Sequence, residues 1–137
     1  MRFRLAILSG FLLALLLGRE TAAWHVGRGS ATDGDTVKIG EARFRLKGVA
    51  APEGRSGPAA DFARKTIAAS GWIACRETGG LTFSRYEAFC YTASGVDIGA
   101  AIIRAGLACA ASNPKWRVTG YGALEPKEHP RDCGYGA

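Results

Sequence analysis

Polar and apolar residues alternate over two short segments in the first third of the chain. The segments are Thr36–Ile39 and Ala42–Val49, and a Gly-Glu turn lies between them. Period-two alternation on both sides of a short turn predicts a β-hairpin with one buried face. Pro52 ends the second strand, so Glu53 lies where the chain leaves the sheet. The exposed face of that strand carries a row of cations: Arg43, Arg45 and Lys47.

Two helices and a second hairpin follow. Ser56 is expected to cap a helix from Pro58 to about Ser70, and Asp97 to cap another over Ile98–Ala105. Between the helices, residues 72–75 and 81–92 predict two strands joined by a turn at 79–80, and a short helix is expected around 123–127. Short strands around a small core with interposed helices predict a mainly β, α+β fold: a closed five-stranded barrel with two or three packed helices.

The first residues predict a secretion signal. A basic start precedes the apolar run Leu5–Leu17, and Thr21-Ala22-Ala23 supplies small residues at the two positions that a signal peptidase checks. A membrane anchor is the alternative, but this almost wholly apolar run of 13 residues is shorter than the roughly 20 that span a bilayer. We therefore expect cleavage of residues 1–23. Residues 24–137 would then form one secreted or periplasmic domain, a monomer that no longer contacts the membrane.

Charge and cysteine content refine this picture. The 137-residue chain has a formal net charge of +6, and removing residues 1–23 takes away three arginines and one glutamate. The moderate positive charge that remains fits a polyanionic ligand, and also an ordinary basic surface. Four cysteines in a small exported domain favour two disulfides over zinc, which would need closer spacings. We expect Cys75–Cys90, across the second hairpin through a bulge or slanted register, and Cys109–Cys133, which ties down the tail.

Opposite charges meet at the first hairpin. Asp33 and Asp35 precede its first strand, and the cations lie along its second. Hydrolysis of a phosphodiester needs a base and a metal on one side, and guanidinium groups that neutralise the phosphate on the other. A charged, solvated hairpin face is the alternative interpretation.

Three motifs, in this order and spacing, resemble the staphylococcal-nuclease-like (thermonuclease) family. They are D-G-D-T-V from Asp33, an R-L-x-G-V-x-x-P-E string with Arg45 eight residues before Glu53, and G-V-D-I from Gly95 leading into I-R-A-G-L-A from Ile103. The resemblance covers about residues 26–110. It implies an oligonucleotide/oligosaccharide-binding (OB-fold) barrel that cleaves DNA and RNA with calcium.

The resemblance also implies roles for single residues. Arg45 matches the family's first catalytic arginine, and Glu53 matches its glutamate, which would act as general base. Arg85, five residues before Cys90, matches the second arginine, although Phe83 and a serine replace the usual tyrosine and glycine before it. Both arginines would bind phosphate through planar forks. Phe83, which can stack on a base, and Lys47 are the substrate-binding candidates.

The metal site departs from the family. Asp35 matches one calcium ligand, but Ala50 and Ala51 stand where the family has aspartate and threonine. Ca²⁺ prefers six to eight oxygen ligands, so a divalent-cation site is expected to be weakened. Ala50→Asp is expected to tighten calcium binding unless Glu87 or another loop compensates. The pocket tyrosine after the second helix is missing too, and Trp116 or Tyr121 either replaces it or simply packs.

These residues predict an exported phosphodiesterase that hydrolyses DNA or RNA, with Glu53 as base and Arg45 and Arg85 as phosphate clamps. One alternative is a catalytically impaired module that binds nucleic acid or another anion. A third class is a disulfide-stapled structural domain of an envelope assembly. The three retained catalytic residue types favour the enzyme, whereas Ala50 and Ala51 favour the binding module.

Overall fold

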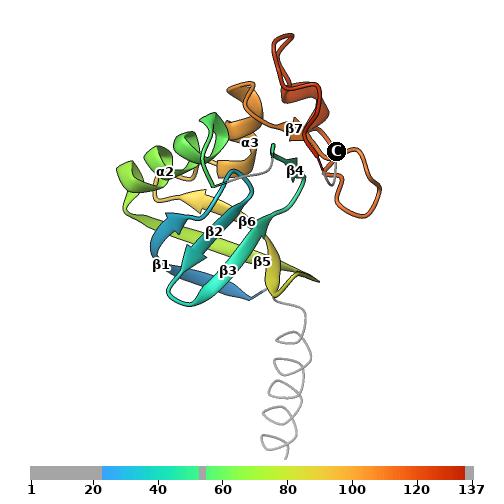
Figure 1. The fold of residues 1–137 in the computed structure, drawn as a ribbon. Helices are drawn as coiled ribbons and strands as arrows, with labels where there is room; N and C mark the ends of the chain where they lie inside the picture. Colours follow the sequence, from blue (N-terminus) through green and yellow to red (C-terminus); the bar gives the residue numbers. More distant parts are fainter. Residues whose placement is uncertain (1–22, 53–54, 135–137) are drawn as a thin grey trace, which may run out of the picture.

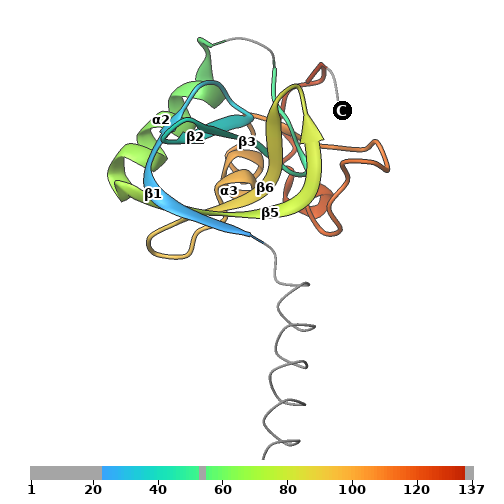
Figure 2. The ribbon, with the colours of Figure 1, turned by 90° about the horizontal axis from the view of Figure 1, so that it is seen from below.

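Five strands form a closed barrel. The structure, a computed structural model, describes residues 23–52 and 55–134. The order around the barrel is β1-β2-β3-β6-β5, in which β3 and β6 run parallel and β1 pairs with β5 to close the ring (Figures 1 and 2). This confirms the predicted five-stranded barrel with packed helices. The strands are β1 (Trp24–Ala31), β2 (Thr36–Ile39), β3 (Ala42–Leu46), β5 (Trp72–Thr82) and β6 (Arg85–Thr92).

Two helices cover one end of the barrel, above the strands in Figure 1. α2 (Pro58–Ser70) buries small residues and Ile67, while α3 (Ile98–Arg104) buries Ile102 and Ile103. The buried helix residues join Val37, Phe44 and Leu46 of the barrel in one apolar core. A second, two-stranded sheet pairs β4 (Val49–Ala50) with β7 (Cys109–Ala110), and η1 (Gly122–Leu124) is a single 3₁₀ turn.

The helix starts are only partly as predicted. Asp97 caps α3, because its carboxylate accepts a hydrogen bond of 3.1 Å from the amide of Ala100. Ser56 is not the cap of α2, however. Gly57 occupies that position with a φ of 141°, which only glycine adopts readily, and no side chain caps the helix. The short helix expected around 123–127 is only the η1 turn, since Pro126 has no amide hydrogen with which to continue it.

The second hairpin turns later than predicted. The turn lies at Phe83 and Ser84, both with positive φ (49° and 59°), and not at the two glycines. Residues 79–80 instead lie inside β5, where the register with β6 shifts between Glu77 and Leu81. A side chain at Gly80 would collide with the Glu87 carboxylate, so a larger residue there would require the Glu87 side chain to shift.

The first hairpin is shorter than predicted, and β1 was not foreseen. β3 ends at Leu46, and the chain turns at Gly48, which has a φ of 82° and where a Cβ would collide with Val118 and Tyr121. Val49 and Ala50 consequently leave the barrel and pair with β7. β1 begins at Trp24, directly after the predicted signal segment, so no turn residues in the sequence mark its start.

Both predicted disulfides are present. Cys75 and Cys90 lie directly opposite each other in β5 and β6, with their Cα atoms 4.1 Å apart. The register shift after Glu77 makes this possible although the turn is not midway between them, so the expected bulge is confirmed. Cys109 and Cys133 join β7 to the tail, with Cα atoms 6.1 Å apart.

Removing the tail disulfide is expected to destabilise the fold. The double variant Cys109→Ser/Cys133→Ser should lose roughly 2–4 kcal/mol in the free energy of unfolding, because the tail regains freedom in the unfolded chain. Urea unfolding measures this loss, and non-reducing peptide mapping of the parent protein checks the pairing. A Cys75–Cys109 or Cys90–Cys133 peptide would contradict the structure, as would unchanged stability.

Candidate functional site

Asp35 holds two arginines together at the start of β2. Arg85 Nη1 lies 3.3 Å from Asp35 Oδ1, and Arg45 Nη2 lies 3.9 Å from Asp35 Oδ2. Thr36 completes the group: its hydroxyl donates to Asp35 Oδ1 at 2.8 Å and accepts from Arg85 Nη1 at 2.7 Å. Three of the residues chosen from the sequence therefore meet, although Arg85 is 50 positions from Asp35. These four residues are named the arginine cluster: Asp35, Thr36, Arg45 and Arg85.

Strand pairing explains why the cluster forms. The first hairpin places Thr36 directly opposite Arg45. The parallel pairing of β3 with β6 places Arg45 beside Glu87, so Arg85, two residues earlier on β6, lies on the same outward face. The inward positions of these strands carry core residues such as Phe44, so the cluster rests on a packed support.

Arg45 is nearly enclosed. Only 2% of the residue is exposed, its Nη1 donates to the carbonyl of Leu46 at 3.1 Å, and its guanidinium carbon lies 5.6 Å from the centre of the Trp116 ring. Trp116 itself is buried. Charge interactions are stronger where water is excluded. The arginine cluster therefore concentrates two guanidinium groups in a partly water-excluded setting, and the Trp116 ring covers Arg45.

Asp33 lies next to the arginine cluster, and its surroundings disfavour the ionised form of its carboxyl group. Its carboxylate accepts a 3.1 Å hydrogen bond from the amide of Asp35. Burial raises the pKa of Asp33 above its usual value, and a hydrogen bond and charge repulsion from Asp35 raise that pKa further. Asp33 therefore resists ionisation, and Asp35 is the carboxylate that pairs with the arginines.

The other predicted site residues have more varied positions. Glu53 lies outside the described residues. Phe83 is 75% exposed at the tip of the β5–β6 hairpin, two residues before Arg85, where it is free to stack on a ligand. Lys47 follows β3 and is half-buried, and its amide donates to the carbonyl of Ala88 at 3.0 Å.

The position of Glu87 beside Arg45 was not predicted from the sequence. It is buried on the outward face beside Arg45 and accepts a hydrogen bond of 3.2 Å from the hydroxyl of Thr82. The sequence suggested it only as a compensating metal ligand. Because Glu87 lies two residues after Arg85 on β6, the sequence could have placed both on one face of the strand. It could not show that β6 pairs in parallel with β3, which brings Glu87 beside Arg45.

The described residues do not fit the calcium ligand set that the resemblance implies. Ala50 is fully buried and packs against Cys109 and Cys133, whereas Ala51 is buried against Gly34. Neither offers an oxygen ligand from its side chain, and the Asp35 carboxylate is already engaged. Within residues 23–52 and 55–134, no group of three or more His, Cys, Asp or Glu residues is arranged to hold a metal ion.

Tyr121 has a packing role. Its hydroxyl donates to Asp97 Oδ2 at 2.6 Å, and burial together with this hydrogen bond raises the pKa of Tyr121. Its ring lies in the space that a side chain at Gly48 would need, so it shapes the end of β3. Of the two aromatic residues considered for the ligand pocket, only Trp116 lies at the arginine cluster.

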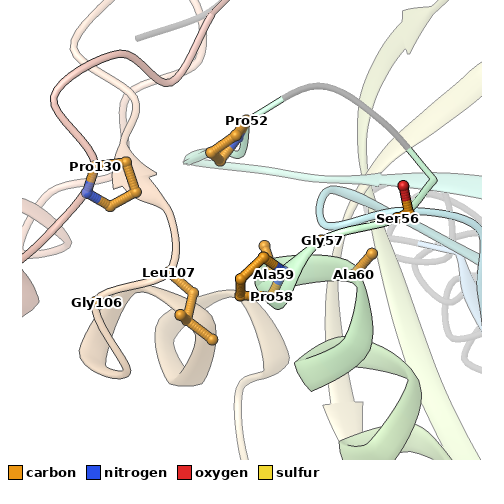
Figure 3. A pocket seen from close by; sticks show the side chains of 9 residues that line it. All are labelled: Pro52, Ser56, Gly57, Pro58, Ala59, Ala60, Gly106, Leu107 and Pro130. Carbon is orange, nitrogen blue, oxygen red and sulfur yellow. The ribbon is translucent and has the colours of Figure 1, made fainter.

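A cavity of about 230 Å³ lies beside the start of α2 (Figure 3). Its wall includes Pro52, Pro58, Leu107 and Pro130, and Ser56 adds a hydroxyl. The described residues that line the cavity carry no ionisable side chain, and their mainly apolar surface could bind an apolar group.

Comparisons with known proteins add no assignment. The chain matches no protein-family model, and no curated protein is significantly similar to it. Among the described residues, none of the helices has the length and apolarity needed to cross a membrane. Function is therefore inferred from the residues and the geometry of the barrel.

Asp33→Asn is expected to stabilise the protein at neutral pH. A carboxyl group with a raised pKa favours the folded state when protonated, and it loses that contribution as the pH rises from about 3.8 through the folded pKa. Asparagine stays neutral and can still accept the hydrogen bond from Asp35. Urea unfolding at pH 7 and below pH 3.8 should show a gain that disappears in acid. The exposed Asp61→Asn serves as control, and a loss of stability at pH 7 in Asp33→Asn would refute the account.

Ala50→Asp is now expected to destabilise the fold instead of restoring calcium binding. The new carboxylate would be buried against the Cys109–Cys133 disulfide, and the free energy of unfolding should fall by about 2–4 kcal/mol. Urea unfolding and calorimetric titration with calcium test this, with the exposed Ala93→Asp as control. Tighter calcium binding without loss of stability would contradict this expectation, because it would show that the new carboxylate at position 50 binds calcium together with Asp35.

Proposed function

We propose that this protein is an exported nuclease-like phosphodiesterase that hydrolyses DNA or RNA. The supporting observation is the arginine cluster, in which guanidinium groups from β3 and β6 converge on the Asp35 carboxylate, and the one from β6 also donates to the Thr36 hydroxyl. Two arginines fixed on neighbouring strands match the spread charge of a phosphodiester in its transition state, because each presents a planar fork of donors.

The cluster has donors to spare for a substrate. Arginine carries five N–H groups, and Arg45 uses one for the carbonyl of Leu46. Its 3.9 Å separation from Asp35 is an ion pair beyond hydrogen-bond range, so the remaining donors can turn to a phosphate oxygen. Phosphate reaches Arg45 only when the Trp116 ring moves aside.

Glu53 is proposed as the general base. Water attacks phosphorus and gives its proton to the Glu53 carboxylate, the bond to the leaving oxygen breaks, and that oxygen takes a proton from solvent. Arg45 and Arg85 neutralise the charge that builds on the phosphate oxygens. A divalent cation belongs to the proposal only as a weak site at Asp35, and no step is assigned to it.

Export is proposed from the N-terminal pattern together with the disulfides. Both disulfides are typical of an oxidising compartment, which fits a secreted or periplasmic protein. Nucleic acid is the proposed partner, and the domain is proposed to act as a monomer.

A non-catalytic binding module is the second candidate, and three observations favour it. Arg45 is covered by Trp116, and Asp35 is neutralised by two arginines while Ala50 provides no second carboxylate. Such a protein would bind nucleic acid without cleaving it. Binding and cleavage assays on the same preparation distinguish the two functions.

Two conservative substitutions test the enzyme. Glu53→Gln removes the base, and Arg45→Lys keeps the charge but loses the fork, so each should lower the cleavage rate by roughly 10²- to 10⁴-fold. Lysine is chosen for Arg45 because alanine would remove one of the two positive charges that pair with the partly buried Asp35 carboxylate. Initial rates on a single-stranded DNA and an RNA give the comparison.

Matched controls keep the result interpretable. Glu41→Gln and Arg104→Lys change the same residue types at exposed positions away from the cluster, and they should cleave like the parent. Urea midpoints verify that every variant is folded. Full cleavage by folded Glu53→Gln or Arg45→Lys would remove that residue from the mechanism.

A further inference from the structure

One wall of the barrel, away from the arginine cluster, exposes large apolar side chains. Trp24 and Val26 of β1 and Trp72 of β5 are 55%, 64% and 55% exposed. Their strands lie side by side (Figure 2). Single exposed apolar residues are ordinary, but several together on one face mark an interaction site. This face is named the aromatic wall and comprises Trp24, Val26, Arg28, Trp72, Ala74, Arg76 and Tyr91.

The strand register makes the aromatic wall continuous. β1 and β5 are antiparallel, and Trp24, Val26 and Arg28 lie opposite Arg76, Ala74 and Trp72 respectively. Alternate positions such as Gly27, Ile73 and Cys75 are buried, so the wall residues all point outward. The Trp24 and Tyr91 rings lie 6.1 Å apart, and the short side chain of Ala74 leaves room for this approach. Two aromatic platforms result, one at Trp24–Tyr91 and one at Trp72.

Charge on the aromatic wall has a single sign. Arg28 lies beside Trp72, and the Arg76 guanidinium lies 5.6 Å from the centre of the Phe89 ring. None of the outward positions of β1, β5 and β6 on this wall is a carboxylate, and Arg28 has no ion pair among the described residues. Aromatic rings interleaved with unpaired cations complement a ligand that has flat rings and negative charge.

Further cations connect the aromatic wall to the arginine cluster. Arg43 lies two residues before Arg45 on β3, and Lys38 lies directly opposite Arg43 on β2. Like charges opposite each other disfavour the sheet, and neither cation has an ion pair within the described part of the chain. Lys38 in turn lies opposite Ser30, two residues from Arg28. These three residues are named the cationic track: Arg28, Lys38 and Arg43.

We propose that the cationic track and the aromatic wall bind single-stranded nucleic acid extending from the arginine cluster. This inference rests on the proposed function and adds a second subsite to it. Aromatic platforms that stack on bases and cations that follow the backbone are the means by which proteins bind single strands without sequence preference. Strand spacing and rise make the path from Arg45 to Trp72 about 25–30 Å long, which only an oligomer can cover.

Binding of two oligonucleotides tests the proposal. The protein as exported by the cell is titrated with fluorescein-labelled dT20 and dT3 in the presence of a chelator, and binding is followed by anisotropy and tryptophan fluorescence. Each of Trp24→Thr and Trp72→Thr should weaken dT20 binding roughly 5- to 100-fold and remove part of the fluorescence quenching. Both should leave dT3 binding unchanged, because dT3 reaches only the arginine cluster.

Controls separate the aromatic wall from general surface effects. Val96→Thr changes an apolar side chain that is 43% exposed outside the wall, and it should bind dT20 like the parent. Arg28→Gln should weaken dT20 binding and its salt dependence, whereas Arg117→Gln, an exposed cation outside the track, should change neither.

Each contrary outcome overturns a defined part. If folded Trp24→Thr and Trp72→Thr bind dT20 as tightly as the parent, the aromatic wall is not a binding site for single strands. In that case, loss of dT20 and dT3 binding in Arg45→Lys would still support the proposed function. If dT20 binding is intact but the wall variants lose binding to phosphatidylglycerol vesicles, the aromatic wall binds a lipid surface. If dT20 binding is intact but they lose self-association in sedimentation, the aromatic wall binds a second copy of the chain. No dT20 binding by the parent also overturns the proposal, and cleavage assays then judge the proposed function independently.

Discussion

The arginine cluster depends on the Asp35 carboxylate. Arg45 is almost completely enclosed, and an enclosed guanidinium without a nearby anion would cost several kcal/mol. Asp35 supplies that anion for Arg45 and Arg85 together, and it is positioned by Thr36 on one side and by the Asp33 turn on the other. This one carboxylate therefore links the first hairpin to β6 and keeps two cations within reach of one ligand.

The tail acts on the same site from the outside. The Cys109–Cys133 disulfide fastens the chain beyond β7, and Trp116 lies in the segment between the two cysteines. That segment is held again where Tyr121 donates to Asp97 at the start of α3. The barrel thus supplies the arginines, whereas the fastened tail supplies the ring that covers one of them. Access to the cluster is consequently a property of the tail as much as of the barrel.

Local patterns explain what could be predicted from the sequence. The Thr36–Ile39 hairpin strand, the Asp97 cap and the two disulfides follow from period-two alternation, a capping residue and an even cysteine count. The meeting of Asp35, Arg45 and Arg85 was expected from the family resemblance. It depends on the parallel pairing of β3 with β6, which alternation alone does not reveal.

Errors arose where a tertiary contact overrode a local signal. The glycines at 79–80 suggested a turn, but they lie at the register shift inside β5 beside the Glu87 side chain, and the turn lies at two residues with positive φ. The strand expected to reach Val49 ends at Leu46, and Tyr121 from the tail occupies the space beside Gly48. The burial of Ala50 against a disulfide was likewise invisible in the sequence, and it changes the meaning of the missing carboxylate.

We propose that the arginine cluster belongs to a phosphodiesterase. The most direct measurement is the cleavage of 5′-labelled single-stranded DNA and RNA by the purified protein, with a chelator and with a series of divalent metals. We expect shortened products from at least one of the two polymers. Intact DNA and RNA under every condition, from protein that unfolds cooperatively and binds both polymers, would contradict the enzyme and assign the cluster to a binding module.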